Sequence, residues 1–554
     1  MTGIDEASLH ALVVHGDRAT VVGPGLRREV ELAALPALAG EVQARGRPRW
    51  VWWDAASAAG PLVGAGVHLA RCWDVAEAHR LLAGGWRADP GAALAFARGE
   101  PLPPEPVDRP SAATLFDDEE PSEAPDPRNS PELLLETARR QLALLGPVSP
   151  RAVATATSES AAALLAVELG TDGLPVDRSA LEDLITEAAG PRPVSSADDV
   201  ALRRRRDADV LRHVPGREST DLRNPAQVRA LLAAVGVVVP DTRKHRLQAY
   251  RHVHPVVDAL LGWRKAERIA TTYGWHWMDT HVGADDRLRG AWTACDGAAG
   301  RMTAQGGLHN LPAALRPAIA AHPGHVLVRA DLGQVEPRVL AAVSGDERFA
   351  AAAAADDLYA PVAAALGVER HVAKVAVLAA MYGQTSGAAG QALERMERSY
   401  PTAMAHLRHA YEAGLRGQPV HTFGGRLVRT GWGEAGAGGG SGIPDGADGA
   451  GAEGAALRAA RGRFARNAVI QGAAAELFKS WAATVRAGLR DLDAEIVLCL
   501  HDELLVHVRR EQAARAREVV ERSLGASARW WAGSDRVRFV ADTAVVHRWS
   551  EAGH

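Results

Sequence analysis

The sequence predicts a multidomain protein of the α+β or α/β class, and three observations support this prediction. Apolar, β-prone runs that end on carboxylates occur in the middle and near the end of the chain. Long segments between them have the three- and four-residue apolar spacing of helices. Two low-complexity stretches interrupt this pattern. With 554 residues and a hydrophobic content of 47%, the chain can form two or three domains with a sizeable core.

The N-terminal region, residues 1–100, is expected to form one domain of short strands and helices. Within it, Arg47–Ala56 is a strand candidate that ends near Asp54. Residues 101–132 are rich in proline and acid and poor in apolar residues, so we expect a linker there. From 133 to about 285 the pattern is largely helical, and residues 133–554 are expected to form the second domain.

Two further segments have a distinct composition. Residues 249–273 combine helical apolar spacing with basic residues on the opposite face. This pattern fits an ordinary amphipathic helix, and it also fits a helix that follows a phosphate backbone. Residues 431–454 are rich in glycine, and we expect a loop there because a recognisable pattern resumes afterwards.

Charge and cysteine content limit the possible functions. The net charge is only −4, from 63 basic and 67 acidic residues, so any basic surface for nucleic acid must be local. Cys72, Cys295 and Cys499 are isolated and odd in number, which argues against a disulfide framework or a zinc site and fits a reducing cytosol. A signal peptide and a membrane span are not expected, because neither pattern occurs in the sequence.

The most informative segment is Val497–Val508, in which two β-prone runs flank His501, Asp502 and Glu503. A buried carboxylate is unfavourable unless a cation compensates it, so we expect these acids at a hairpin tip that faces a metal or a phosphate. A second apolar strand leads to Asp331. Two strand-borne aspartates far apart in sequence are what two-metal phosphoryl transfer requires, although Asp331 alone fits a helix cap equally well.

Polar residues follow and precede the Asp331 strand. After it we expect a strand-to-helix turn with Glu336 and Arg338 in the first helical turn, where Pro337 is tolerated. Before it, a polar, glycine-bearing loop at 300–312 carries Arg301 and Asn310, which can contact a phosphate backbone. Most loops of this composition have no such role.

One helical segment carries Arg370, Lys374, Leu378 and Tyr382 at four-residue intervals, so these side chains share a face. Two cations one turn apart can hold a triphosphate while the tyrosine ring meets a base. A solvated face with two charges is the simpler interpretation.

A later helical segment presents Arg463, Asn467 and Gln471 on one face. These side chains are donors suited to sugar and base edges in a minor groove. Ordinary surface polarity also explains the pattern.

The order of these motifs is more specific than any one of them. The run GRM…NLP, DLGQVEPR, R-x3-K-x7-YG, R-x3-N-x3-Q and HDE resembles the polymerase module of family A DNA polymerases, the bacterial DNA polymerase I type. The resemblance covers about 133–549 and implies a right-hand fold. It places a thumb at about 133–300, a palm at about 300–345 and 460–554, and fingers at about 346–459.

The resemblance also implies residue roles. Asp331 and Asp502 match the two metal-binding aspartates, the Leu332 carbonyl a further ligand, and Glu503 an auxiliary acid. Two Mg²⁺ ions are expected, with Mn²⁺ as a substitute. The expected nucleotide-side residues are Arg370 and Lys374 at the triphosphate, Lys374 also as proton donor to pyrophosphate, Tyr382 at the template site, Glu336 against a ribose 2′-OH, and Gln334, Leu378 and Tyr359. The expected DNA contacts are Arg301, Asn310, Arg463, Asn467, Gln471 and His501.

Four positions depart from the family pattern. Leu378 stands where the family has an aromatic ring, and Tyr359 stands where a histidine contacts the triphosphate. Leu332 and Gly333 replace Tyr-Ser. None of these changes removes a metal ligand, so we expect activity, with reduced efficiency or altered discrimination between nucleotide analogues.

The N-terminal domain resembles a ribonuclease H-like 3′–5′ exonuclease only weakly. WVWWDAAS matches its first motif with Asp54 kept and the partner acid replaced by Ala56, and Cys72–Leu82 resembles a later helix. Thr155–Glu168 lacks the tyrosine and the aspartate of the last motif. A two-metal nuclease needs about four carboxylates, so we expect a degenerate fold without exonuclease activity. A 5′-nuclease domain is not expected.

We therefore expect a template-directed DNA polymerase of DNA replication or repair, acting as a monomer in the bacterial cytoplasm. Its expected partners are primer–template DNA and deoxynucleoside triphosphates, with no membrane. The alternatives are a polymerase-like DNA-binding protein with weak catalysis, a metal-dependent nuclease that uses the same aspartates, or a viral-type RNA polymerase. Glu336 favours deoxynucleotides over the last of these.

Overall fold

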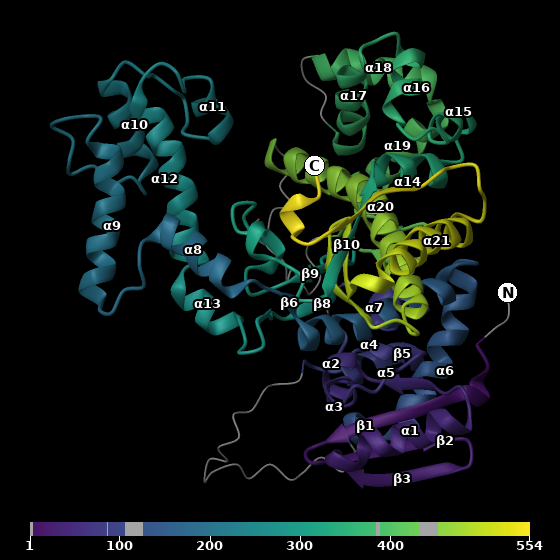
Figure 1. Cartoon of the computed structure of the whole chain (residues 1–554). Helices are drawn as coiled ribbons and strands as arrows, with labels where there is room; N and C mark the ends of the chain where they lie inside the picture. The colour runs from purple at the N-terminus through teal and green to yellow at the C-terminus, as the bar shows by residue number, and fades with distance from the viewer. Residues whose placement is uncertain (1–3, 86, 106–125, 384–387, 432–451, 554) are drawn as a thin grey trace. The chain divides into compact units, whose positions relative to one another are not determined.

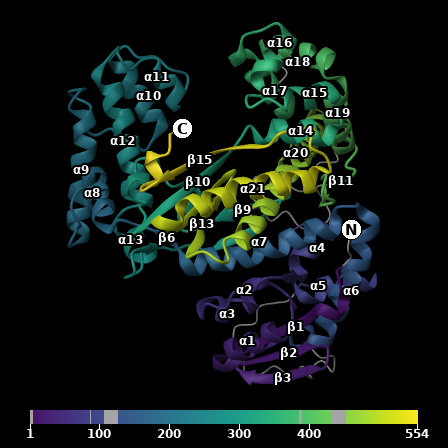
Figure 2. The ribbon, with the colours of Figure 1, turned by 45° about the vertical axis from the view of Figure 1, so that its right-hand side comes forward.

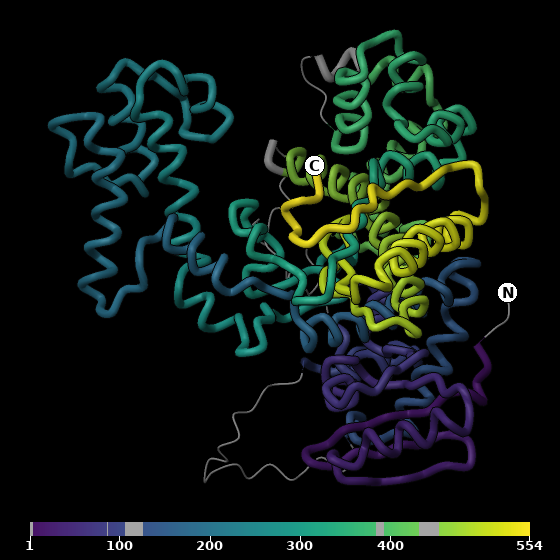
Figure 3. The backbone as a smooth tube through the Cα atoms, viewed as in Figure 1, coloured from purple at the N-terminus to yellow at the C-terminus, as the bar shows by residue number. Residues whose placement is uncertain are grey.

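The computed structural model describes residues 4–85, 87–105, 126–383, 388–431 and 452–553 (Figure 1). The chain divides into two compact units, and each unit is built from three segments that can be followed along the tube in Figure 3. The first unit comprises Met1–Asp172, Ala291–Ala304 and Val328–Val545, and the second comprises Gly173–Gly290, Gln305–Leu327 and Val546–His554.

A five-stranded sheet in the order β3-β2-β1-β4-β5 forms the N-terminal part of the first unit. Its strands are β1 (Leu9–His15), β2 (Arg18–Gly23), β3 (Leu26–Glu31), β4 (Arg49–Trp52) and β5 (Cys72–Asp74). β1, β2 and β3 are antiparallel, whereas β4 and β5 run parallel to β1. β4, which lies between β1 and β5 and is parallel to both, buries Trp50, Val51 and Trp52, as its continuous apolar run predicts. The sheet is therefore mixed, and the ribonuclease H-like character expected for this domain stays a prediction.

Five helices lie between or after the last strands of this sheet along the chain: α1 (Leu35–Arg45), α2 (Ala55–Ala58), α3 (Gly60–Gly64), α4 (Val75–Ala83) and α5 (Pro90–Arg98). Side-chain caps determine where several of them begin. Asp89 accepts a hydrogen bond from the Ala92 N–H before α5, and Pro90 then occupies the first turn, where its missing N–H is not needed.

The next two helices, α6 (Pro131–Val148) and α7 (Ala152–Asp172), share the core of the N-terminal sheet. Leu134 of α6 and Ala156 of α7 lie in one buried cluster with Ala11 and Trp73. This differs from the domain boundary expected at 133, because the second compact unit begins only at Gly173. The apolar faces of both helices need the sheet to cover them. Residues 106–125 of the expected linker lie outside the described residues.

Among the described helices, α7 alone is long and apolar enough to cross a membrane by composition. Its most apolar 18-residue window has a mean hydropathy of 1.2, but 67% of that window is buried. α7 contacts β5 and the long helix α20 (Ala452–Gly488). In Figure 2, α7 is drawn next to the N-terminal elements α2 and α4. α7 is therefore packed in this structure as the core helix of the first unit.

The first unit also contains a four-stranded sheet in the order β13-β14-β10-β15. Its strands are β10 (His325–Gly333), β13 (Ala494–Leu500), β14 (Glu503–Arg509) and β15 (Val540–Val546), and α20 and α21 (Ala513–Ala532) contact β13 and β14, respectively. β13 and β14 are antiparallel with Leu500 opposite Glu503, so His501 and Asp502 form the two-residue turn. The expected hairpin with acid at its tip is confirmed.

Between β10 and α20 the first unit is mainly helical. The helices are α14 (Val335–Ser344), α15 (Glu347–Ala352), α16 (Tyr359–Leu366), α17 (Arg370–Tyr382), α18 (Ala388–Ser399) and α19 (Pro401–Leu415). A short hairpin follows, formed by β11 (Val420–His421) and β12 (Leu427–Val428). The first unit also contains the antiparallel pair β8 (Trp292–Asp296) and β9 (Arg301–Ala304). Most of the glycine-rich segment expected as a loop at 431–454 lies outside the described residues.

The second unit is largely helical, with one short strand pair, β6 (Leu174–Pro175) and β7 (Arg287–Leu288). Its helices are α8 (Arg178–Ala189), α9 (Ser196–Leu211), α10 (Pro225–Ala234), α11 (Lys244–Gln248), α12 (Pro255–Thr272) and α13 (Trp275–His281). The helix expected at 249–273 begins only at Pro255, because His254 caps it by accepting the Val256 N–H.

Candidate active site

β10 and the β13–β14 hairpin bring the two predicted metal-binding acids to neighbouring strands. The Leu332 N–H, one residue after Asp331, donates a hydrogen bond of 2.9 Å to the carbonyl oxygen of Asp502. His501 adopts a left-handed conformation with φ 56°, as tight two-residue hairpin turns require. Asp331 lies within β10 rather than at its end, and Gln334, also at φ 56°, makes the turn into α14.

A buried arginine that the sequence interpretation missed lies beside these acids. Arg329 precedes Asp331 by two residues on β10, so both side chains project from the same face. Arg329 Nη2 lies 2.6 Å from Asp331 Oδ2, Arg329 Nε donates to Glu503 Oε1, and Arg329 Nη1 lies 3.9 Å from Asp542 Oδ2. The Arg329 side chain is only 2% exposed. A single arginine inside the apolar run VLVRAD was the available sequence signal.

The acids around Asp502 leave an excess of negative charge. Burial raises the pKa of Asp502, and the charges of Glu503 and Glu336 raise it further, whereas Arg301 lowers it. A raised carboxyl pKa means that a nearby cation would stabilise the ionised form. The donor set of Asp331 and Asp502 consists of carboxylate oxygens, which are the ligands that Mg²⁺ prefers. The residues present therefore fit a divalent metal ion.

Glu336 connects this site to α17 and to β9, because Arg301 begins this strand and does not lie in a loop as expected for 300–312. Arg301 Nη2 donates to Glu336 Oε1 at 3.1 Å, and the Tyr382 hydroxyl donates to Glu336 Oε2 at 2.6 Å. Burial and the bond to this carboxylate raise the pKa of Tyr382 to about 12. As expected, Glu336 lies in the first turn of α14, with Pro337 directly after it.

At its other end, α17 is held by an acid that the sequence interpretation did not assign. Arg370 Nε and Nη2 donate to the two carboxylate oxygens of Asp357 at 2.6 and 3.1 Å. Gln334 Nε2 donates to the same carboxylate at 2.7 Å, so Asp357 links Gln334 to Arg370. The Arg370 bond holds the pKa of Asp357 below its ordinary value. Asp357 is part of the segment DDLYAP, and only the fold reveals its partner.

The remaining α17-side residues have different environments. Tyr359 is only 5% exposed, and the Arg370 Cζ lies 5.7 Å from its ring centroid, so the two side chains form a cation–π contact. Lys374 is exposed and forms no ion pair among the described residues. Leu378 is half-buried on the same helix.

The residues expected to contact DNA lie in both units. Arg463 is exposed on α20, and Asn467 and Gln471 are half-buried one and two turns further on. His501 is exposed in the hairpin turn. Asn310 lies in the second unit, where its carbonyl accepts hydrogen bonds from Arg268 and Tyr273.

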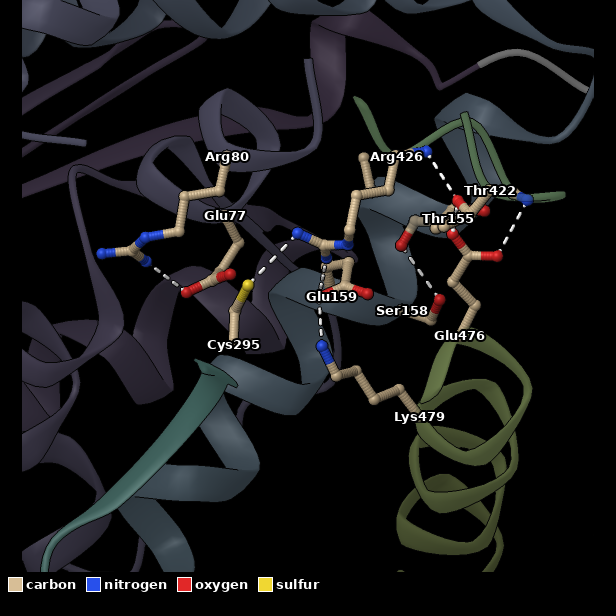
Figure 4. A network of polar contacts seen from close by, with 12 residues as sticks. Glu77, Arg80, Thr155, Ser158, Glu159, Cys295, Thr422, Arg426, Glu476 and Lys479 are labelled. Carbon is tan, nitrogen blue, oxygen red and sulfur yellow. Dashed lines mark hydrogen bonds and ion pairs between the residues drawn. The ribbon is translucent and has the colours of Figure 1, made fainter. Parts of the chain in front are cut away.

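A second acid cluster lies deep inside the first unit (Figure 4). One ligand-type atom each of Glu77, Glu159 and Cys295 lies within 4.8 Å of the others, so Cys295 is not isolated as the sequence suggested. Cations already occupy this cluster. Glu159 Oε2 lies 2.8 Å from Arg426 Nη2 and 2.5 Å from Lys479 Nζ, and Arg426 Nη1 donates to Cys295 Sγ at 3.1 Å. These contacts make it a buried ion-pair network rather than a metal site.

The N-terminal sheet places Asp54 after β4, where its carboxylate caps α2 by accepting the Ser57 N–H at 2.8 Å. β1 and β4 are parallel neighbours, so their carboxyl-terminal ends lie side by side. β1 ends there with Val13, Val14 and His15, and it contributes no carboxylate.

These strand-borne acids lie beside a helix that carries two cations, and their carboxylate oxygens fit a divalent metal ion. The family model for DNA polymerase family A matches residues 216–551. The chain therefore belongs to DNA polymerase family A.

Similar proteins support this assignment. The chain is 29% identical over 307 residues to DNA polymerase I, thermostable, of Thermus thermophilus, and 28% identical over 305 residues to DNA polymerase I of Chloroflexus aurantiacus. Each match covers 50% of this chain but only 35% and 30% of the relative, so it spans about a third of these proteins.

One solved structure resembles nearly the whole chain. It is the polymerase domain of Pol1 from M. smegmatis in complex with DNA primer-template and dNTP, with a TM-score of 0.68 at 21% identity. The similarity covers 98% of this chain and 96% of the other. At this identity the comparison supports the fold.

Proposed function

We propose that this chain is a template-directed DNA polymerase that extends a primer 3′-hydroxyl with deoxynucleoside triphosphates, in DNA replication or repair. The observation that carries the proposal is the hydrogen bond from Tyr382 to Glu336. It joins α17, with Arg370 and Lys374, to the helix directly after the Asp331 strand. A nuclease that used the same aspartates would need no triphosphate-binding helix beside them.

Asp331 and Asp502 would hold Mg²⁺ in this mechanism, and bound metal ions supply activation of the 3′-hydroxyl and neutralisation of the triphosphate. Arg370, fixed by Asp357, would orient the triphosphate through the guanidinium edge that Asp357 leaves uncovered. Lys374 would donate a proton to the leaving pyrophosphate. The carboxylate of Glu336 would exclude a ribose 2′-hydroxyl from the nucleotide position.

We also propose that the N-terminal domain is a degenerate exonuclease fold that serves as a structural platform. Two features support this role. Asp54 uses its carboxylate as a helix cap, and the facing end of β1 has no acid. The domain shares its core with α6 and α7, which fits a platform.

Primer extension on a primed DNA template tests the polymerase proposal. We expect Asp331→Ala and Asp502→Asn each to lower the rate at least about a thousandfold, because the metal ligands contribute several kcal/mol to transition-state stabilisation. Asp493→Ala is the matched control, since the Asp493 side chain forms an exposed ion pair with Arg509. Undiminished synthesis by both site variants would refute the assignment. Parallel reactions with rNTPs report sugar selection.

A further inference from the structure

Arg329 occupies an unusual place for a permanent charge. Its guanidinium is almost fully buried, and it contacts carboxylates that come from two different strands, Asp331 on β10 and Glu503 on β14. Arginine stays protonated at any physiological pH, so this charge cannot be removed by titration. The Asp331 oxygen that it contacts belongs to one of the two acids assigned to metal binding.

We propose that Arg329 is a resident counter-cation of the acid cluster, which sets how tightly this site binds a divalent metal ion. The inference rests on the proposed function, because it takes Asp331 and Asp502 as the metal ligands. Arg329 partly neutralises the cluster before any metal arrives. A divalent ion at Asp331 would therefore meet a fixed positive charge and a carboxylate with one oxygen already engaged.

A purely structural role explains only part of this geometry. Glu503 is buried and needs a cation, and Arg329 Nε supplies one. Asp331 is more exposed than Glu503 and can be solvated by water. Arg329 Nη2 nevertheless lies 2.6 Å from Asp331 Oδ2, so the guanidinium group contacts both acids. Besides helping to compensate the buried guanidinium, this contact places a fixed positive charge against a carboxylate that water could otherwise solvate.

Two effects on the site follow. Without metal, the guanidinium reduces repulsion between the acids of adjacent strands and so stabilises the metal-free site. With metal, a divalent ion at Asp331 would share the carboxylate with Arg329 Nη2 or displace it. Both effects predict that the chain needs a higher divalent-ion concentration than the same site would need without the arginine.

Manganese binding to the full chain, measured by electron paramagnetic resonance of free Mn²⁺, tests the proposal independently of catalysis. The matched pair is Glu503→Gln and Arg329→Met/Glu503→Gln, in which the glutamine avoids leaving a buried acid uncompensated. We expect the double variant to bind Mn²⁺ at least roughly tenfold more tightly than Glu503→Gln, because a nearby unit charge is removed. Equal or weaker binding would overturn the proposal, and so would absence of binding in both.

Further variants separate charge from fold. Arg329→Lys keeps the charge and should stay near wild-type affinity; tightening as large as in the methionine variant would contradict the role given to charge. If the methionine double variant does not fold by circular dichroism, Arg329→Gln/Glu503→Gln replaces it with the same expectation. In Asp331→Ala/Asp502→Asn, undiminished Mn²⁺ binding would mean that the metal site itself is misassigned. Loss there, without an effect of Arg329, would refute this inference alone.

Discussion

At the residue scale, buried carboxylates depend on the few groups that face them. Glu476 on α20 is almost fully buried. It accepts hydrogen bonds from the Thr422 hydroxyl and from the Gly424 N–H, the latter at 2.8 Å. Burial nevertheless raises the pKa of Glu476 to about 7, and these bonds and the charge of Arg426 offset only part of that effect. The same competition between burial and compensating charge raises the pKa of Asp502.

Stability should fall with rising pH because of Glu476. Its folded-state pKa lies above the ordinary value of 4.5, so the folded chain binds this proton more tightly than the unfolded chain does. The contribution is complete below pH 4.5 and is lost as the pH rises through 7. Glu476→Gln has no carboxyl to ionise, so its unfolding free energy should not fall in this way. Relative to wild type, its unfolding free energy should therefore rise by up to about 3 kcal/mol between pH 4.5 and pH 7. Urea unfolding at several pH values measures this, with the exposed Glu521→Gln as control. A stability difference that does not change with pH would contradict it.

At the element scale, α17 is tied at both ends to the turn after Asp331. Arg370 reaches Gln334 through Asp357, and Tyr382 reaches Glu336 directly. The segment that carries Asp357 is itself fixed, because the buried Arg338 donates to the carbonyl oxygens of Ala353, Ala355 and Asp356. The spacing of α17 predicted its polar face, whereas the two ties depend on how the helix docks.

Asp357 should act on nucleotide binding through Arg370. Arg370→Ala should raise the dNTP KM at least roughly tenfold through loss of charge-assisted bonds. Asp357→Asn should raise it roughly two- to fivefold, because the pair is partly exposed. In steady-state primer extension, Asp357→Asn should add little in the Arg370→Ala background. Additive effects, or a loss confined to kcat, would contradict a positioning role.

At the scale of the whole first unit, α7 connects the N-terminal sheet to α20. Its inner faces contact β5 and α20, and Glu159 on α7 forms ion pairs with Lys479 of α20 and with Arg426 of the β11–β12 hairpin. All three side chains are buried. The N-terminal sheet and the polymerase elements of this unit are therefore joined through one core.

Removing the central acid of this network should destabilise the unit strongly. Glu159→Gln leaves Arg426 and Lys479 buried without an anion, which should cost about 3–5 kcal/mol of unfolding free energy. Chemical denaturation followed by circular dichroism measures this loss. Glu168→Gln is the matched control on α7, because its pair with Arg486 is more exposed. Equal effects of the two changes would contradict the network's structural role.

Local sequence patterns are sufficient to predict which side chains share a helix or a strand. The HDE hairpin tip, the strand before Asp331, and the polar faces of α17 and α20 follow from local periodicity and turn chemistry. The partners of these groups depend on tertiary packing. Arg329 between Asp331 and Glu503, Asp357 behind Arg370, and α6 and α7 in the N-terminal core all depend on contacts between distant segments. Local patterns do not encode such contacts, because the same residue is a solvated charge or a buried partner according to the packing around it.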